Sequence, residues 1–313
     1  MGRHLFTILF TSIVILTSCI DDHYKPTVIT PKVVLIVMDG ARYTETWGDS
    51  THQFIPFLSD SIAPKGAVFT NLKNQGITST IPGHTALITG YYDTLANNGT
   101  EYPTHPSIFQ YFEQKYQEKS WIISSKDKLS VLSNCKDSLW QNQYNPYFDC
   151  GKEGLGTGYG YRDDSITLKK ALWILDVFKP RLCLINFKEP DASGHSGNWN
   201  NYLKAIQTTD SLIYLIYKYL DADPFYKDQT IVFITNDHGR HLDGIRDGFK
   251  SHGDTCAGCR HCMLFTYGPN IKKGIRVDTL YSFIDVTETM ASVLKLKMID
   301  MEGQDIRETF SNW

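Results

Sequence analysis

Side chains that can bind a metal ion are concentrated in five short motifs that lie far apart in the sequence. The motifs are VLIVMDG, TIPGH, EPDASGH, TNDHG and KSHG. Together they supply carboxylates, imidazoles and one hydroxyl: Asp39, Thr80, Asp191, His195, Asp237, His238 and His252. Aspartate and histidine around a hydroxyl are what a two-metal hydrolytic site requires. The residue types therefore predict a metal-dependent hydrolase.

The predicted strands bring most of these ligands to one edge of a sheet. Residues 32–38 form a continuous β-branched run, which is typical of a strand buried on both faces, and Asp39 follows directly. Other strands are predicted over 181–187, before Asp191, and over 230–235, before Asp237. Open α/β sheets bind ligands in the crevice at the carboxyl ends of their strands.

Strand-like and helix-like segments alternate along the chain, as in α/β proteins with a parallel sheet. Further strands are predicted over 121–124 and 262–267, and helices over 82–89, 106–117, 164–178, 201–220 and 285–296. The glycine-rich segment 151–161 is predicted to be a loop, because it follows no clear strand and lacks the Lys-Ser/Thr ending of a nucleotide loop. We expect an α/β fold with a mainly parallel central sheet, helices on both faces and a small cap formed by insertions.

In this order, the motifs resemble the alkaline phosphatase superfamily, most closely its type I phosphodiesterase/nucleotide pyrophosphatase-like branch. The resemblance extends from Val33 to about Asp305 and is strongest in TIPGH, EPDASGH and DHG. It implies two zinc ions and a nucleophile, Thr80, that touches one of them. The implied ligands are Asp191, His195 and His252 for one ion, and Asp39, Asp237 and His238 for the other.

The implied chemistry suits the residue types. A threonine hydroxyl is a poor nucleophile at neutral pH unless a metal ion stabilises its alkoxide, and two ions can clamp the attacking and leaving oxygens of an in-line displacement. The expected intermediate is a threonyl-phosphate on Thr80. Sulfatases of the superfamily use Cys or Ser in a C/S-x-P-S-R frame, whereas this chain has Thr80 and, in place of the arginine, His84.

Candidate substrate-binding residues follow from the same resemblance. The segment SKDK, with Lys126 and Lys128, resembles the Lys-Asp-Arg of a Thr-type phosphomonoesterase, although Lys128 lacks the bidentate fork of arginine. Asn97 or Asn98 occupies the region where the family has an asparagine against a phosphoryl oxygen, and we assign Asn98. A solvated charged turn and an Asn-Gly turn are the alternatives for these segments. Phosphodiesterase and phosphomonoesterase activities both remain open.

The N-terminus is predicted to be a lipoprotein signal peptide. Arg3 precedes a short apolar stretch, residues 5–16, and LTSC then resembles the bacterial lipobox that ends at the lipidated Cys19. We expect a signal peptide over 1–19, a polar tether over 20–30 and a catalytic domain over 31–313. This predicts a lipid anchor in a bacterial envelope membrane, on the periplasmic or surface face of the outer membrane. An ordinary secretory signal is the alternative.

Composition restricts the partners. The net charge of −3 gives no reason to expect nucleic-acid binding beyond nucleotide substrates, and a small phosphate ester is the expected substrate. Cys183 lies in an apolar run and is predicted to be a buried thiol. In the segment Cys256-x-x-Cys259-x-x-Cys262 the spacing favours a disulfide over another metal site.

The sequence thus predicts a zinc-dependent phosphoric ester hydrolase. A sulfatase or phosphonate hydrolase of the same superfamily is the enzymatic alternative. The alternative from another class is a non-catalytic, metal-stabilised lipoprotein that binds glycans or phosphorylated polymers. A binding role needs no nucleophile, so Thr80 within the full ligand set argues for an enzyme.

Overall fold

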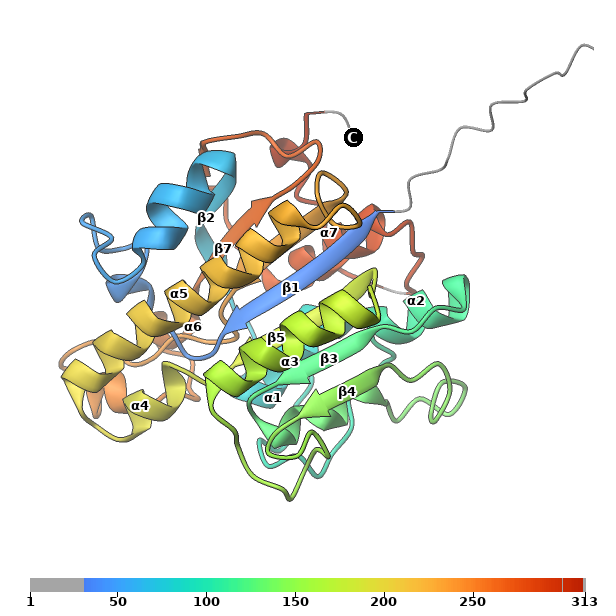
Figure 1. Ribbon diagram of the computed structural model, residues 1–313. Coiled ribbons are helices and arrows are strands. Elements are labelled where there is room, and N and C mark those ends of the chain that lie inside the picture. The colour runs from blue at the N-terminus through green and yellow to red at the C-terminus, as the bar shows by residue number, and fades with distance from the viewer. Residues whose placement is uncertain (1–30, 300, 312–313) are drawn as a thin grey trace, which may run out of the picture.

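The computed structural model describes residues 31–299 and 301–311. Its centre is a nine-stranded sheet in the order β4-β3-β5-β1-β6-β7-β2-β8, with β9 beside β2 (Figure 1). The strands are β1 (Lys32–Met38), β2 (Gly66–Lys73), β3 (Trp121–Ser124), β4 (Tyr147–Cys150), β5 (Leu182–Phe187), β6 (Thr230–Thr235), β7 (His261–Tyr267), β8 (Ile275–Val277) and β9 (Tyr281–Ser282).

The sheet is mainly parallel, as predicted. β4, β3, β5, β1 and β6 pair in parallel, and β7 alone runs antiparallel to its neighbours β6 and β2. The carboxyl ends of β1, β3, β5 and β6 therefore meet at one edge. In Figure 1 this is the edge toward which β1 points and near which α4 and α6 lie.

Helices cover both faces, because each strand of the sheet centre is apolar on both sides. In β1, Val33, Leu35 and Val37 pack into one core and Val34 and Ile36 into the other. The first core includes residues of α1, α2 and α7, and the second includes residues of α3, α5 and the π-helical turn η2 (Phe57–Ile62). The helices are α1 (Thr80–Thr89), α2 (Ile108–Tyr116), α3 (Asp164–Val177), α4 (Asp191–His195), α5 (Trp199–Ala222), α6 (Ala257–Arg260) and α7 (Phe283–Val293).

The predicted strands and long helices are confirmed to within a few residues, but three short strands and β2 were missed. β2 pairs with β7 over most of its length, and at its start a Cβ on Gly66 would lie 2.0 Å from the Thr266 carbonyl oxygen. A glycine is needed there for close approach of two backbones. The glycine-rich segment is a loop, as predicted, but the expectation that no strand precedes it was wrong, because β4 ends directly before it.

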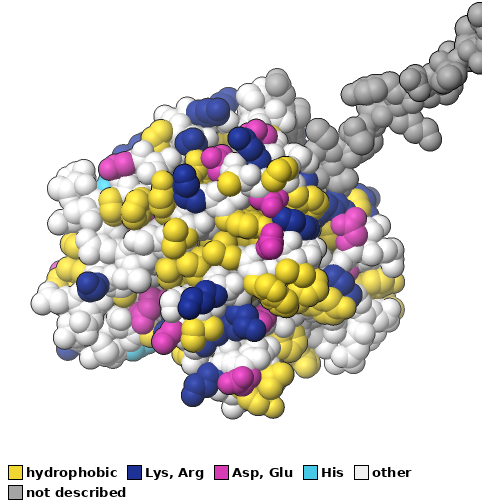
Figure 2. Space-filling view, in the orientation of Figure 1, with side chains coloured by type: hydrophobic (Ala, Val, Ile, Leu, Met, Phe, Trp, Pro, Cys, Tyr) yellow, Lys and Arg dark blue, Asp and Glu magenta, His cyan; other side chains and the backbone are white. Residues whose placement is uncertain are grey.

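The surface agrees with the small net charge. On the face covered by α3 and α5, Figure 2 shows basic and acidic side chains interspersed with hydrophobic ones. Within the described part of the chain, no helix has the length and apolarity needed to span a bilayer. The predicted signal peptide, tether and Cys19 lie outside the described residues.

Candidate active site

The predicted ligands come together at the carboxyl edge of the sheet. Asp39 follows β1, Asp191 begins α4 after β5, and Asp237 and His238 follow β6. The backbone joins two of these segments, because the Asp191 N–H donates to the Asp39 carbonyl over 3.0 Å. Parallel pairing of β1 with β5 and β6 is what brings these residues, distant in sequence, into one site.

Thr80 is the first residue of α1 and is 1% exposed. The Lys126 ammonium group lies 3.1 Å from its Oγ1, 2.8 Å from Asp39 Oδ1 and 2.7 Å from Asp191 Oδ2. The Lys126 ammonium group therefore connects the hydroxyl to one carboxylate of each predicted ligand set. His84, one turn along α1, donates from Nδ1 to the Thr80 carbonyl over 2.8 Å.

Asp191, His195 and His252 converge on one point. His195 Nε2 lies 3.3 Å from Asp191 Oδ1 and 3.1 Å from His252 Nε2, and His252 Nε2 lies 3.2 Å from Asp191 Oδ1. His252 Nδ1 is 2.8 Å from the Thr78 carbonyl, which can only accept, so this nitrogen carries the proton. Its Nε2 is thereby left as a lone pair, the form that binds a metal ion.

Asp39, Asp237 and His238 form the other side of the site, and all are fully buried. His238 Nε2 lies 3.7 Å from Asp39 Oδ1 and 3.5 Å from Asp237 Oδ2. The proton of His238 is on Nδ1, which faces the Gly239 carbonyl at 2.9 Å. Its ring also stacks on that of His252 at 3.7 Å, so His238 lies between the two ligand sets.

Two buried acceptor atoms of this group are available to bind a cation. Asp237 Oδ1 accepts the N–H groups of Gly40 and His238, but Asp237 Oδ2 and His238 Nε2 are buried without a hydrogen-bond partner among the described residues. His84 Nδ1 lies 3.3 Å from that carboxylate oxygen but its proton goes to Thr80. Leaving a buried acceptor unpaired costs about 1–3 kcal/mol, and a bound metal ion removes that cost.

Two buried residues that support the ligands were not predicted. Arg240 is 0% exposed, and its guanidinium pairs with Asp191 and donates to the Lys250 carbonyl over 2.9 Å. Asn186 on β5 donates to Asp39 Oδ2 and faces His84 Nε2, each over 3.2 Å. The position of Arg240 directly after Asp237-His238-Gly239 was the only sequence signal for it.

The predicted substrate-binding residues separate into two groups. Lys126 is at the centre of the site, and Lys128 lies beside it, donating to Asn97 Oδ1 over 3.0 Å. Asn97 Oδ1 also accepts the Ile81 N–H of α1 over 3.0 Å. The side chain of Asn98, the assigned residue, instead accepts from the N–H and hydroxyl of Thr100, so the assignment was wrong by one residue and Asn97 is the asparagine that contacts the site.

The charged groups of the site shift one another's pKa values. Burial alone would raise the pKa of Asp191, but Lys126, His195, His252 and Arg240 hold it well below its usual value. Burial opposes the charge of Lys126, yet the carboxylates around it raise its pKa.

The neighbouring groups respond differently. Burial, reinforced by Lys126, lowers the pKa of Lys128 to about 8. Burial also lowers the pKa of His238 to about 3, which keeps its imidazole neutral.

Comparisons with known proteins agree with this architecture. The chain is 24% identical to mouse ectonucleotide pyrophosphatase/phosphodiesterase family member 1 over 232 residues, which is 67% of this chain and 24% of that protein. The chain thus spans about a quarter of the length of that curated relative, and 31% of another, the GPI ethanolamine phosphate transferase 1 of Candida glabrata.

Solved structures share the fold. An inactive variant of murine ectonucleotide pyrophosphatase/phosphodiesterase 5 in complex with AMP matches with a TM-score of 0.62 and 14% identity, covering 90% of this chain and 100% of that one. Phosphonate monoester hydrolase from Silicibacter pomeroyi matches with a TM-score of 0.66 and 14% identity, covering 90% and 78%.

The sulfatase family model matches residues 31–296, most of the chain and every residue of the site. The predicted superfamily is therefore confirmed, and the protein is a hydrolase of this superfamily. Its two candidate metal-binding groups at the sheet edge are Asp191 with His238 and His252, and Asp39 with His84 and Asp237, so the structure groups His238 with the first predicted set and brings His84 to the second. The chain belongs to the sulfatase family, within the alkaline phosphatase superfamily.

Proposed function

We propose that the protein is a zinc-dependent phosphoric ester hydrolase that acts through a threonyl-phosphate on Thr80. The observation that carries this proposal is that one side chain, Lys126, connects the Thr80 hydroxyl to both predicted ligand sets. Lys126 touches the hydroxyl and one carboxylate of each set. Nitrogen-rich ligand sets with three histidines suit zinc better than calcium.

The residues present would hold two ions. Asp191, His195 and His252 would bind one, and Asp39, Asp237 and His238 the other. When bound, the pair would neutralise charge on the attacking and leaving oxygens and favour the alkoxide form of the nucleophile. Carbonyl groups at Thr78 and Gly239 hold His252 and His238 in the tautomer that offers Nε2.

The chain's own groups would carry the substrate steps. Thr80 Oγ1 attacks phosphorus, so that the Thr80 O–P bond forms and the ester P–O bond breaks. The leaving oxygen takes up the proton that the Thr80 hydroxyl has lost. Water then cleaves the threonyl-phosphate and returns the proton to Thr80. Lys126, which already lies 3.1 Å from Thr80 Oγ1, stabilises negative charge on the phosphoryl oxygens.

The substrate class rests on the nucleophile. A threonine cannot be converted to the formylglycine of sulfatases, which favours phosphate over sulfate esters in this member of the family. Phosphonate esters are the second candidate, because the hydrolase from Silicibacter pomeroyi has the same fold and acts on phosphonate monoesters. We further propose that Cys19 carries a lipid anchor that holds the domain at a bacterial envelope membrane.

The test compares an aryl phosphate monoester, a diester, a phosphonate monoester and a sulfate on zinc-loaded and chelated enzyme. We expect phosphate hydrolysis that is lost on chelation and restored by zinc. A dominant sulfatase rate would overturn the substrate class, and equal rates with and without chelator would overturn the two-ion site.

Thr80→Ala tests the nucleophile. We expect this variant to bind zinc like the wild type but to lose turnover by orders of magnitude, because no other hydroxyl replaces Oγ1. Thr80→Ser, which keeps a hydroxyl, is the matched control and should retain part of the activity. Wild-type turnover in purified Thr80→Ala would exclude Thr80 as the nucleophile.

A further inference from the structure

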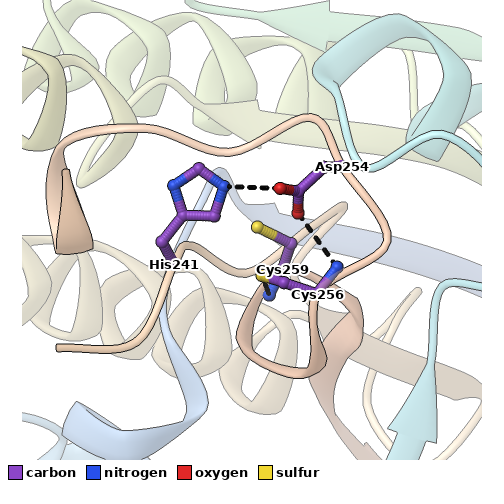
Figure 3. A group of neighbouring side chains, drawn as sticks. All are labelled: His241, Asp254, Cys256 and Cys259. Atoms are coloured by element: carbon purple, nitrogen blue, oxygen red, sulfur yellow. Dashed lines mark hydrogen bonds and ion pairs between the residues drawn. The ribbon is translucent and has the colours of Figure 1, made fainter. Parts of the chain in front are cut away.

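A second cluster of metal-binding side chains lies apart from the Thr80 site, in the loop between β6 and β7. It consists of His241, Asp254, Cys256 and Cys259, and one potential ligand atom from each lies within 4.8 Å of all the others. Figure 3 shows the His241 imidazole and the Asp254 carboxylate facing each other, with the Cys259 sulfur beside them. His241 and Cys259 are buried, and Asp254 and Cys256 are partly exposed.

The contacts of the cluster prepare its atoms for a cation. His241 Nε2 lies 3.1 Å from Asp254 Oδ2, while its Nδ1 faces Asp247 Oδ1 at 3.0 Å. A carboxylate on one ring nitrogen orients the other toward a metal ion. The Cys259 N–H donates to Cys256 Sγ over 3.2 Å, which fixes the position of this sulfur beside the other three side chains.

The cysteines are free thiols. The disulfide favoured by the Cys-x-x-Cys spacing is absent among the described residues, and Cys135, Cys150, Cys183 and Cys262 are also free. Cys262 is fully buried in β7 and is not one of the four clustered residues. The residues that join the two cysteines are His241, fifteen residues before Cys256, and Asp254, two residues before it, and the Cys-x-x-Cys spacing alone indicated neither.

We propose that His241, Asp254, Cys256 and Cys259 bind one structural zinc ion, separate from the pair proposed at Thr80. Two sulfurs, one imidazole nitrogen and one carboxylate oxygen make four ligands, the number that closes a tetrahedral structural zinc site. The thiolates select zinc against calcium and magnesium, which prefer oxygen. Arg246, which pairs with Asp254 Oδ2 over 3.0 Å, has a side chain 66% exposed and is free to turn into solvent when the carboxylate binds the ion.

The position of this site suggests what it does. Asp254 lies two residues after His252, and its carbonyl accepts the Thr78 hydroxyl over 2.6 Å. The Gly253 N–H donates back to Thr78 Oγ1 over 3.1 Å, and the Gly239 N–H donates to the Cys259 carbonyl over 2.7 Å. A zinc ion on the four side chains would clamp the loop that carries His238 and His252 and so position both imidazoles.

Cobalt substitution distinguishes this site from the one at Thr80. Thiolate-to-Co²⁺ charge transfer absorbs in the near ultraviolet, and the six ligands proposed around Thr80 contain no sulfur. The full chain, purified under reducing conditions and depleted of metal, is titrated with Co²⁺ alone. We expect a charge-transfer band that reaches its plateau by three Co²⁺ per chain, the number of proposed sites, and that excess Zn²⁺ abolishes.

Two variants identify the cysteine that gives rise to the charge-transfer band. Cys259→Ala should lose it, whereas Cys262→Ala, a buried cysteine three residues away, should keep it. Differential alkylation and mass spectrometry of the wild-type protein provide a measurement that does not depend on the folding of any variant. With zinc bound, we expect both thiols to be reduced and the partly exposed Cys256 to be protected from alkylation, and chelation should make Cys256 reactive.

Three results would overturn the proposal. The first is a Cys256–Cys259 disulfide in protein isolated without oxidant. The second is alkylation of Cys256 that zinc does not slow, and the third is a wild-type protein without the charge-transfer band. None of these results bears on Thr80, because hydrolysis by the two-ion site is measured separately. Conversely, an inactive enzyme that shows the band would retain the structural site and reject the proposed function.

Discussion

Single side chains in this site act through the charges next to them. Lys126 and Lys128 are two residues apart, but one lies among carboxylates and the other beside the first lysine. The pKa of Lys126 is therefore raised, and that of Lys128 is lowered to about 8. Lys126 therefore stays charged through the pH range in which Lys128 loses its charge.

Lys128 gives a pH prediction that separates monoesters from diesters. A lysine is charged below its pKa, so its contribution is present below pH 8 and is lost as the pH rises through about 8. A monoester carries an additional phosphoryl charge, and we expect its kcat/KM to fall above pH 8 more steeply than that of a diester.

Lys128→Arg is the matched variant, since arginine keeps its charge throughout this range. The steeper fall for the monoester should disappear in this variant. Superimposable pH profiles of the wild type and Lys128→Arg, measured with an aryl phosphate, would show that Lys128 does not recognise the substrate.

At the scale of elements, short segments set the ligand geometry. α4 is five residues long, and a Cβ on Gly194 would lie 2.6 Å from Arg240 Cζ. The absence of a side chain at Gly194 lets the buried guanidinium reach Asp191. The EPDASGH motif therefore contains two proposed ligands, Asp191 and His195, and between them the glycine that leaves room for Arg240.

Gly194→Ala is expected to move Arg240 and so disturb Asp191. We expect kcat/KM to fall on the order of tenfold to a hundredfold, because small displacements of a positioned group are costly in catalysis. Ser193→Ala, one residue earlier in α4, is the control and should be close to wild type. Zinc titration and steady-state kinetics of both variants measure the effect, and equal kinetics would remove Arg240 from the positioning network.

At the scale of the whole molecule, the site lowers the stability of the folded chain when no cation is bound. Asp39, Asp191, Asp237 and His238 are all buried at one sheet edge, and two of their polar atoms lack hydrogen-bond partners among the described residues. Ions that bind only the folded chain stabilise it in proportion to the logarithm of their concentration. Stability and activity should therefore respond to the same metal.

Chelation is expected to lower the melting temperature. At free zinc a thousandfold above its Kd, one ion contributes about 4 kcal/mol, which corresponds to a shift on the order of 10 °C for a domain of this size. Thr80→Ala should show the same shift as the wild type, because it keeps every proposed ligand. Cys259→Ala removes a ligand of the proposed structural site, so the zinc-dependent shift that remains in this variant comes from the Thr80 site. Melting curves that zinc leaves unchanged in Cys259→Ala would contradict a two-ion site at Thr80.

The sequence by itself determined the order of the main strands and helices and the superfamily. A short apolar run rich in β-branched residues, such as residues 32–38, favours a strand buried on both faces, and a polar residue that follows it directly is then expected at the strand end. Parallel pairing then brings Asp39, Asp191 and Asp237 together whatever the details of the loops. The local pattern therefore sufficed for the sheet edge and for the residues gathered there.

Only the tertiary structure decided which groups contact one another across the loops. Arg240 beneath Asp191, Asn97 rather than Asn98 beside Lys128, and His241 with Asp254 at Cys256 and Cys259 depend on contacts between segments that no local period relates. Side chains in loops are positioned by the backbone hydrogen bonds of distant residues, such as Thr78 with Asp254. Sequence spacing carries no information about such contacts, and the fold supplies it.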